Sequence, residues 1–121
     1  MAKIVIIDDD QETTKLLEGI LKINGHEPFS INESRNAIKA VETIMPEMVL
    51  LDIMMAEING IAICKLIKSD PNISDIAVVM VSALNDEGTK RDAFNAGAND
   101  FITKPIFPKE FVKHINGILK I

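Results

Sequence analysis

The residues in this sequence that are best suited to chemistry are acidic, and they follow short apolar runs. Asp8, Asp9 and Asp10 come directly after the first apolar run, and Asp52 interrupts the apolar stretch 48–55. A carboxylate inside an apolar stretch is costly unless its charge is compensated. An acidic residue before a helix often serves only as an N-cap, and that interpretation fits Asp10 as well as a chemical role does. Asp8, Asp9 and Asp52 are therefore the first candidates for a functional site.

A hydroxyl group and an ammonium group occupy comparable positions later in the chain. Ser82 follows the apolar run 76–81, and Lys104 stands shortly after the run 100–102. Taken singly, Ser82 is typical of an N-cap and Lys104 of a solvent-facing residue. In open α/β sheets, however, functional groups gather outside the carboxyl ends of the strands. The placement of the aspartates, Ser82 and Lys104 after successive apolar runs indicates one shared site.

Repulsion between the carboxylates predicts that this site binds a cation. Two carboxylates about 4 Å apart repel each other by about 4 kcal/mol at an effective dielectric constant of roughly 20. A site with few carboxylates and room for water favours Mg²⁺. The formal charge of −3 on Asp8, Asp9 and Asp52 would be neutralised by Mg²⁺ together with Lys104. A neutral pocket with one nucleophilic carboxylate can accept a phosphoryl group, because phosphoryl transfer depends mainly on positioning and charge neutralisation.

The elements that must position these groups alternate along the chain. The runs 3–7, 48–51 and 76–81 are nearly continuous in Ile, Val, Leu and Met, which is typical of strands that are covered on both faces. The run 27–31 contains Pro28, which favours an edge strand, and 100–102 is the last run. Helical apolar stripes separate the runs, for example Leu16, Leu17, Ile20 and Leu21, or Phe111, Ile115, Ile118 and Leu119. This alternation predicts five strand-helix units in one parallel sheet wrapped by helices on both faces.

Length and composition limit the possible classes of protein. A chain of 121 residues with 47% apolar and 26% charged residues is typical of one globular domain. The single cysteine, Cys64, excludes a disulfide framework within the chain and a cysteine-based zinc site. The net charge of −5 argues against direct binding of nucleic acid. No apolar run approaches the about 18 residues of a membrane span, and the first run is too short for a signal peptide, so we expect a cytoplasmic protein without membrane insertion.

Two further expectations concern residues outside the candidate site. Trp and Tyr are absent, and most of the five Phe residues are expected in the core. His26 and His114 are isolated in the sequence and are expected to have structural or solvent-facing roles. Cys64 is expected to be a small core residue.

In these motifs the sequence resembles the CheY-like receiver domain of two-component response regulators, over the whole chain. The matching segments are Asp8-Asp9, 49–55 around Asp52 with Gly60 following, 81–83, 97–101 and Lys104-Pro105. The resemblance implies a flavodoxin-like (βα)5 doubly wound sheet of five parallel strands in the order 2-1-3-4-5. It also implies that residues 1–121 are a single receiver domain, with no output domain in this chain.

The resemblance assigns a role to each site residue. Asp52 is expected to be the phosphoacceptor. The Mg²⁺ ligands are expected to be Asp9 directly, Asp8 through water, Asp52 itself and the backbone carbonyl of Met54. Ser82 and Lys104 are expected to contact phosphoryl oxygens, Ser82 and Phe101 to form the switch, and the Lys104-Pro105 peptide bond to be cis.

The resemblance also implies a mode of action and partners. The phosphoryl donor is expected to be a phosphohistidine of a sensor histidine kinase or a phosphotransfer protein. The chain is expected to act as a signalling switch that catalyses only its own phosphorylation and dephosphorylation. The fourth helix, fifth strand and fifth helix are expected to bind a downstream protein or a second copy of the chain. That surface carries Lys90, Arg91, Asp100 and Lys113.

The sequence departs from the receiver pattern at several positions. Ala56 stands where many receivers have Pro, which is expected to loosen the loop after Asp52 without touching the chemistry. Phe101 stands where Tyr is frequent and therefore lacks a hydroxyl group. Met54 and Leu84 occupy the variable pocket positions that tune hydrolysis, and both are apolar. We therefore expect a long-lived phosphoprotein.

Other functions remain to be weighed. Asp8-x-Asp10 after an apolar strand resembles the start of haloacid-dehalogenase-like phosphatases, but Glu12 stands where Thr or Val is expected. A flavin carrier would need a phosphate-binding loop where this chain has three aspartates. A non-phosphorylated interaction module on the same fold would tolerate loss of Asp9, Asp52 or Lys104, and none of these is lost. Fold alone does not separate these functions, so the site must decide.

Overall fold

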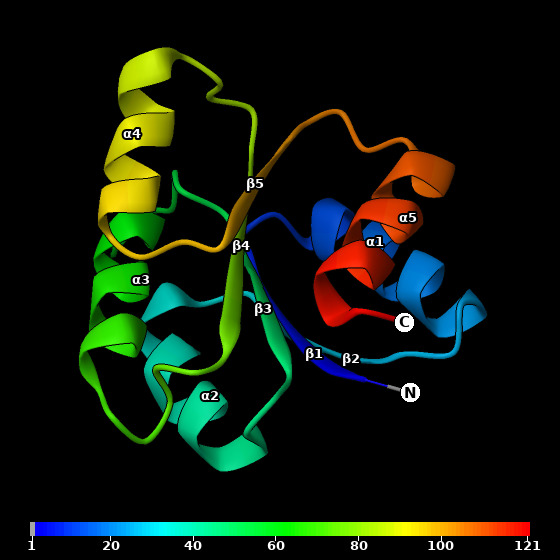
Figure 1. Cartoon of the computed structure of the whole chain (residues 1–121), viewed down its shortest axis with the longest axis horizontal. Coiled ribbons are helices and arrows are strands. Elements are labelled where there is room, and N and C mark those ends of the chain that lie inside the picture. The colour runs from blue at the N-terminus through cyan, green and yellow to red at the C-terminus, as the bar shows by residue number, and fades with distance from the viewer. Residues whose placement is uncertain (1) are drawn as a thin grey trace.

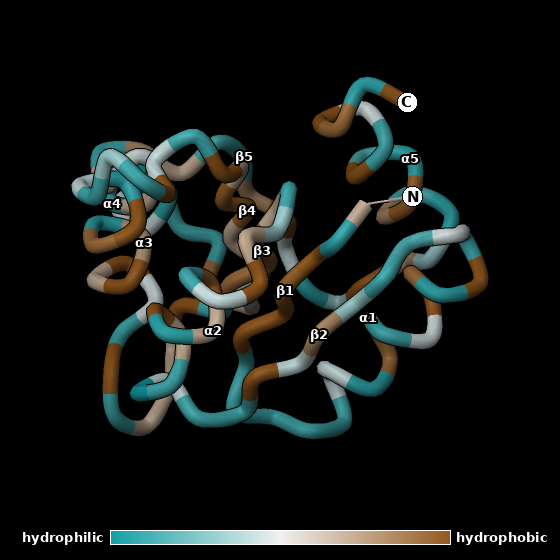
Figure 2. Tube along the Cα trace, turned by 90° about the horizontal axis from the view of Figure 1, so that it is seen from below, coloured by the Kyte–Doolittle hydropathy of each residue, from teal (hydrophilic) through white to brown (hydrophobic). Residues whose placement is uncertain are grey.

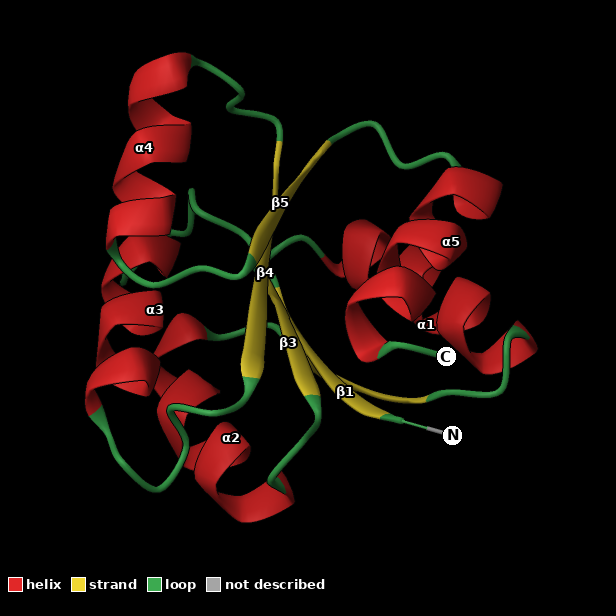
Figure 3. Ribbon diagram, viewed as in Figure 1, coloured by secondary structure: helices red, strands yellow, loops and turns green. Residues whose placement is uncertain are grey.

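The computed structural model describes residues 2–121, which form a three-layered α/β molecule around one sheet (Figures 1 and 3). The strands are β1 Lys3–Ile7, β2 Glu27–Ile31, β3 Met48–Leu51, β4 Ala77–Ser82 and β5 Asp100–Thr103. All neighbouring strands pair in parallel, and the sheet order is β2-β1-β3-β4-β5. The predicted fold and its strand order are confirmed, and Pro28 lies on an edge strand as expected.

Helices cover both faces of this sheet. They are α1 Gln11–Ile23, the short 3₁₀ helix η1 Ser34–Asn36, α2 Ala37–Ile44, α3 Gly60–Ser69, α4 Glu87–Asn95 and α5 Pro108–Leu119. In Figure 1, α1 and α5 lie together on one side of the sheet, and α2, α3 and α4 lie on the other. Within residues 2–121, none of these helices is both long and apolar enough to cross a membrane.

The two helical layers enclose two separate apolar cores. Alternate residues of each central strand point to opposite faces, so Val5 and Ile7 pack under α2 and α3 while Ile4 and Ile6 pack under α1 and α5. The tube through β1, β3 and β4 is accordingly hydrophobic along most of its length (Figure 2). Burial of each large aliphatic side chain contributes about 1.5–3 kcal/mol. The strands therefore lack an alternating pattern because both of their faces are buried.

Local side-chain contacts determine where three of the helices begin. The side chains of Asp10, Asn59 and Asp86 each accept a hydrogen bond from a main-chain N–H in the first turn of α1, α3 and α4, respectively. These contacts satisfy N–H groups that have no partner within the helix. At the other end of α2, Met45 adopts a left-handed conformation with φ 52° and ends the helix before Pro46. The N-cap interpretation of Asp10 is therefore confirmed.

The aromatic and histidine expectations have mixed outcomes. Phe111 is 2% exposed, Phe29 and Phe101 are partly buried, and Phe94 and Phe107 are 47% and 62% exposed. The prediction that most Phe residues lie in the core is therefore wrong. Phe29 and Phe101 lie on the edge strands β2 and β5, and Phe94 and Phe107 belong to α4 and to the connection before α5. His26 is buried with Nε2 3.0 Å from Asn116 Oδ1, and His114 Nε2 lies 2.7 Å from Asp100 Oδ2. Cys64 is buried, as expected.

Candidate functional site

The strand register brings the predicted site residues to one edge of the sheet. Ile7 pairs with Leu51, so Asp8 and Asp52 leave adjacent strands side by side. Ser82 is the last residue of β4 and pairs with Thr103, which places Lys104 directly beyond it. Main-chain hydrogen bonds continue past the strand ends, from Asp52 N to Ile7 O and from Lys104 N to Ser82 O, each 2.9 Å. The site is therefore built on the rigid ladder of the sheet.

The carboxylates of Asp8, Asp9 and Asp52 form a compact cluster. One oxygen from each lies within 4.8 Å of the others. Asp8 is 3% exposed and Asp52 is 7% exposed, whereas Asp9 faces solvent. Lys104 Nζ lies 3.0 Å from Asp8 Oδ2 and 3.7 Å from Asp52 Oδ1. The sequence therefore identified groups that meet in space, although they come from positions up to 96 residues apart.

Main-chain N–H groups hold one oxygen of each carboxylate. Asp10 N donates to Asp8 Oδ1 at 2.9 Å, and Ile53 N donates to Asp52 Oδ1 at 2.9 Å. Ala56 N donates to Asp9 Oδ2 at 3.0 Å. Among residues 2–121, no group donates a hydrogen bond to Asp9 Oδ1 or Asp52 Oδ2. These two oxygens are therefore available to a cation or to an incoming electrophile.

The surroundings of Asp52 disfavour its negative charge. Burial is the main reason that the pKa of Asp52 rises from 3.8 to about 6, and the negative charges of Asp8 and Asp9 add to the increase. The ammonium group of Lys104 and the N–H of Ile53 oppose it without cancelling it. The cluster thus carries more negative charge than its own residues can neutralise.

The donor set fits Mg²⁺. It consists only of hard oxygen ligands, part of it faces solvent, and it contains no sulfur or imidazole group. The three carboxylates and Lys104 sum to a formal charge of −2, which one divalent cation would balance. The cluster therefore has the chemistry and the charge deficit of a Mg²⁺ site.

Gly60 supports the site in a way that sequence reasoning recorded only as part of a motif. A Cβ atom at Gly60 would lie 1.9 Å from the backbone oxygen of Asp52 and 2.9 Å from Cα of Ile53. Gly60 N also donates to Ile53 O at 2.8 Å. Only a glycine lets the first turn of α3 approach the residue that follows β3 this closely.

The other predicted residues surround the cluster at varying exposure. Ser82 is buried, and its Oγ accepts a hydrogen bond from Leu84 N at 3.1 Å. Met54 is 64% exposed, and Leu84 is also exposed. Phe101 is half-buried, and Lys90 Nζ lies 5.8 Å from the centre of its ring. The Lys104-Pro105 peptide bond is cis.

The structure corrects one expectation and adds one residue. Ala56 was expected to loosen the loop after Asp52 without touching the chemistry, but its N–H donates a hydrogen bond to Asp9 Oδ2. Asn32, which sequence reasoning missed, donates from Nδ2 to the backbone oxygen of Asp8 at 2.9 Å. Because Asn32 follows β2 directly, the strand-end rule could have found it.

The alternative role of Asp10 is not supported by its contacts. Asp10 Oδ1 accepts a hydrogen bond from Glu12 N, and Oδ2 accepts one from Thr13 Oγ at 2.7 Å. The hydrogen bond from Thr13 is the main reason that the pKa of Asp10 is lowered. Both oxygens of the Asp10 carboxylate therefore serve the start of α1.

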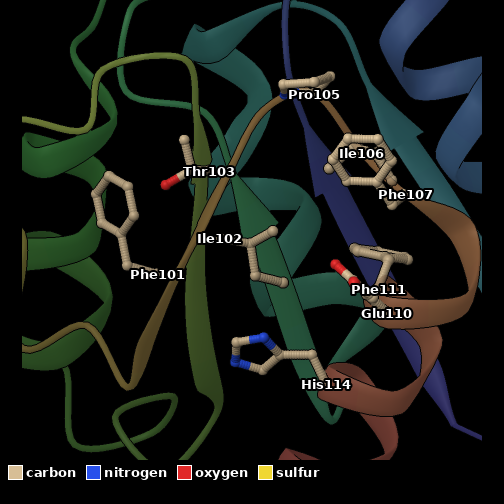
Figure 4. Close-up of a pocket in the computed structure, with 9 residues that line it drawn as sticks. All are labelled: Phe101, Ile102, Thr103, Pro105, Ile106, Phe107, Glu110, Phe111 and His114. Atoms are coloured by element: carbon tan, nitrogen blue, oxygen red, sulfur yellow. The ribbon is translucent and has the colours of Figure 1, made fainter.

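A second concave region lies along β5 and α5, away from the carboxylates (Figure 4). It is lined by residues of β5, of the connection to α5 and of α5 itself: Phe101, Ile102, Thr103, Pro105, Ile106, Phe107, Glu110, Phe111 and His114. The lining contains no acidic cluster comparable to that of Asp8, Asp9 and Asp52. This pocket therefore belongs to the surface of β5 and α5 and not to the cluster of carboxylates.

Comparison with known proteins gives a consistent family. A family model described as "Response regulator receiver domain" matches residues 4–116. The chain is 32% identical over 118 residues to the DNA-binding response regulator MtrA of Mycobacterium tuberculosis, covering 98% of this chain and 50% of that protein. It is also 32% identical to the probable transcriptional regulator ycf27 of Guillardia theta, covering 98% of this chain and 45% of that protein. The chain thus spans about half the length of the curated relatives it matches.

Solved structures agree with this family. A putative response regulator from Chloroflexus aurantiacus superimposes with a TM-score of 0.93 at 28% identity, covering 99% of this chain and 98% of that one. The chemotaxis protein CheY4 of Vibrio cholerae superimposes with a TM-score of 0.92, covering 98% of each chain. Its 19% sequence identity supports a shared fold only.

Proposed function

This chain belongs to the response regulator receiver domain family of two-component systems, and from that premise we propose that it is a phosphoacceptor whose nucleophile is Asp52. One observation carries the proposal. Asp52 is a buried carboxylate with a pKa raised to about 6, and Lys104 and the acidic pair Asp8 and Asp9 lie beside it. A carboxylate held at this energetic cost is typical of a functional group rather than of a structural one.

In the proposed reaction, an oxygen of Asp52 attacks the phosphorus of a phosphohistidine on a sensor histidine kinase or a phosphotransfer protein. Oδ2 is the oxygen without a hydrogen-bond donor, so it is the candidate nucleophile. A bond forms between this oxygen and phosphorus, and the bond from phosphorus to the donor imidazole nitrogen breaks. The imidazole leaves with the electron pair of that bond. The product is an acyl phosphate on Asp52.

The remaining site residues act on charge and position. Lys104 can exchange its contact with Asp52 for one with a phosphoryl oxygen, and the hydroxyl group of Ser82 can donate to another. Asp8, Asp9, Asp52 and the backbone carbonyl of Met54 would hold Mg²⁺, which supplies charge neutralisation at the phosphoryl oxygens. In this proposal the chain is a switch that acts on itself and has no separate substrate to turn over.

The proposed output involves Ser82 and Phe101. After phosphorylation, Ser82 would turn from Leu84 N toward the phosphoryl group, which draws the loop after β4 toward the site. The half-buried ring of Phe101 would then move further inward and change the surface of α4, β5 and α5. That surface carries Lys90, Arg91, Asp100 and Lys113, and we assign it to a downstream protein or to a second copy of the chain.

We treat residues 1–121 as one receiver unit for this proposal. The DNA binding in the printed name of MtrA is a property of that longer protein, and we do not assign it to these residues. The net charge of −5 gives the receiver unit no attraction to a phosphate backbone. Any direct contact with nucleic acid would therefore come from another part of a longer protein.

The proposal is tested by phosphorylating the protein with acetyl phosphate and Mg²⁺. Intact-mass spectrometry should detect one added phosphoryl group on the wild type and none on Asp52→Asn. Asp10→Asn is the matched control, because Asp10 caps α1 and should not alter uptake. EDTA should block the reaction, since the uncompensated carboxylates repel the donor. Equal uptake by Asp52→Asn and the wild type would show that Asp52 is not the nucleophile.

A further inference from the structure

The carboxylate of Asp9 is held by a main-chain group of the loop between β3 and α3. Asp9 is exposed, and Ala56 N donates to its Oδ2 at 3.0 Å. Among the described residues, this is the only hydrogen bond that the structure gives to the side chain of Asp9. An exposed Asp side chain otherwise samples several rotamers. The orientation of Asp9 therefore depends on the main chain at position 56.

With this contact, protein donors occupy four of the six carboxylate oxygens of Asp8, Asp9 and Asp52 and, within residues 2–121, leave two without a hydrogen bond. Both oxygens of Asp8 and Oδ1 of Asp52 are engaged by protein donors. With Ala56 N on Oδ2 of Asp9, the remaining oxygens are Asp9 Oδ1 and Asp52 Oδ2. From this pattern, and resting on the proposed function, we infer that the main-chain N–H of Ala56 is a positioning group for the cation site. It holds Oδ2 of Asp9, which leaves Oδ1 open to an ion, and it restrains the loop that carries the Met54 carbonyl.

The loop is fastened on both sides of Met54. On one side, Ile53 N donates to Asp52 Oδ1. On the other, Ala56 N donates to Asp9, and Ile58 N donates to Ser34 Oγ at 3.2 Å. Loss of the Ala56 contact would free both the Asp9 carboxylate and the main chain that follows Met54. Two proposed ligands, the Asp9 carboxylate and the Met54 carbonyl, therefore both depend on the hydrogen bond from Ala56 N.

The inference depends on the residue type at position 56. A proline at position 56 has no N–H and cannot make this hydrogen bond. In this chain, Ala56 supplies the N–H that joins the loop after β3 to Asp9, a proposed metal ligand.

The test compares Mg²⁺ affinity with and without this N–H group. Replacing the amide of Ala56 by an ester substitutes an oxygen for the N–H and also weakens the Met55 carbonyl as an acceptor, whereas Ala56→Pro removes the N–H genetically. Ala56→Ser keeps the N–H and is the matched control. Calorimetric titration with Mg²⁺ suits this protein, which has no Trp or Tyr for fluorescence. We expect the ester variant to bind Mg²⁺ about three- to tenfold more weakly than the wild type, and Ala56→Ser to differ by less than about twofold.

A second measurement needs no metal. Amide hydrogen exchange in EDTA should be about tenfold slower at Ala56 in the wild type than in Asp9→Ala. The amide of Glu57, for which the structure shows no acceptor, serves as the internal reference for the change in local charge. Equal exchange at Ala56 in both proteins, after this correction, would mean that the contact does not form in solution and would overturn the inference.

The outcomes separate the two proposals. If the wild type binds Mg²⁺ and the ester variant binds it equally well, the positioning role of Ala56 is wrong and the phosphoacceptor proposal stands. If the wild type does not bind Mg²⁺, the proposed function fails, and the inference fails with it. A loss of affinity in Ala56→Ser equal to that of the ester variant would assign the effect to the side chain and overturn the role of the N–H.

Discussion

Replacing Asp52 by Asn should make the metal-free protein more stable at neutral pH. The wild type must keep a buried carboxylate ionised next to two others, whereas Asn keeps the shape and the carbonyl oxygen that accepts from Ile53 N. The increase in the pKa of Asp52 from 3.8 to about 6 gives the size of this cost. About 2 pKa units at 1.36 kcal/mol each correspond to about 3 kcal/mol of unfolding free energy at pH 7.5.

The pH dependence has a definite sign. Between pH 3.8 and about 6, the folded wild type binds a proton at Asp52 that the unfolded chain releases. The wild type therefore becomes more stable, relative to Asp52→Asn, as the pH falls through this range. The advantage of Asp52→Asn should shrink to about half at pH 5 and nearly vanish below the unfolded-state pKa of 3.8.

The assay is urea unfolding followed by circular dichroism, at pH 7.5 and at pH 5, in EDTA. Glu57→Gln is the matched control, because Glu57 is an exposed carboxylate on the same loop but outside the cluster. Saturating Mg²⁺ should narrow the difference at pH 7.5, since it binds the folded wild type. If Asp52→Asn is no more stable than the wild type at pH 7.5, or if its advantage is the same at both pH values, the electrostatic account of the site is wrong.

Three further predictions concern packing, lifetime and output. In the same urea assay, Gly60→Ala should lower the unfolding free energy by more than about 2 kcal/mol, because its Cβ would lie 1.9 Å from the backbone oxygen of Asp52. Gly19→Ala is the control and should be neutral or stabilising, because a Cβ at Gly19 would have no atom within 4 Å. The double variant Met54→Asn with Leu84→Glu should shorten the lifetime of the phosphoprotein, measured by phosphate release, because polar groups can orient the hydrolytic water; an unchanged lifetime would contradict this. Phe101→Ala should still be phosphorylated, but it should lose most of the increase in partner or self-association affinity that beryllofluoride, a phosphoryl mimic, produces in the wild type. If Phe101→Ala shows the full wild-type increase, the switch does not act through Phe101.

The sequence was sufficient to predict the fold and the location of the candidate site. Uninterrupted apolar runs separated by helical stripes require a sheet covered on both faces, and the carboxyl ends of parallel strands must meet at one edge. That rule alone placed Asp8, Asp9, Asp52 and Lys104 together, and the structure has them together. The order of the strands came from the resemblance, because periodicity does not state which strands are neighbours.

Several features of the site depend on contacts that no local pattern encodes. Lys104 Nζ lies 3.0 Å from Asp8 Oδ2 and 3.7 Å from Asp52 Oδ1. These distances depend on the register of β5 against β4, which determines the position of the Lys104 main chain. The exposure of Phe107 likewise depends on where α5 sits over the sheet, not on its hydrophobicity.

The hydrogen bond from Ala56 N to Asp9 depends both on the sequence and on the tertiary structure. The sequence determined that position 56 has an N–H group and that Asp9 follows β1. Only the tertiary structure determined that the two meet, because they are 47 residues apart and belong to loops that leave different strands. Residue type sets which bonds a group can form, and the packing of the sheet and helices sets which partner comes within reach.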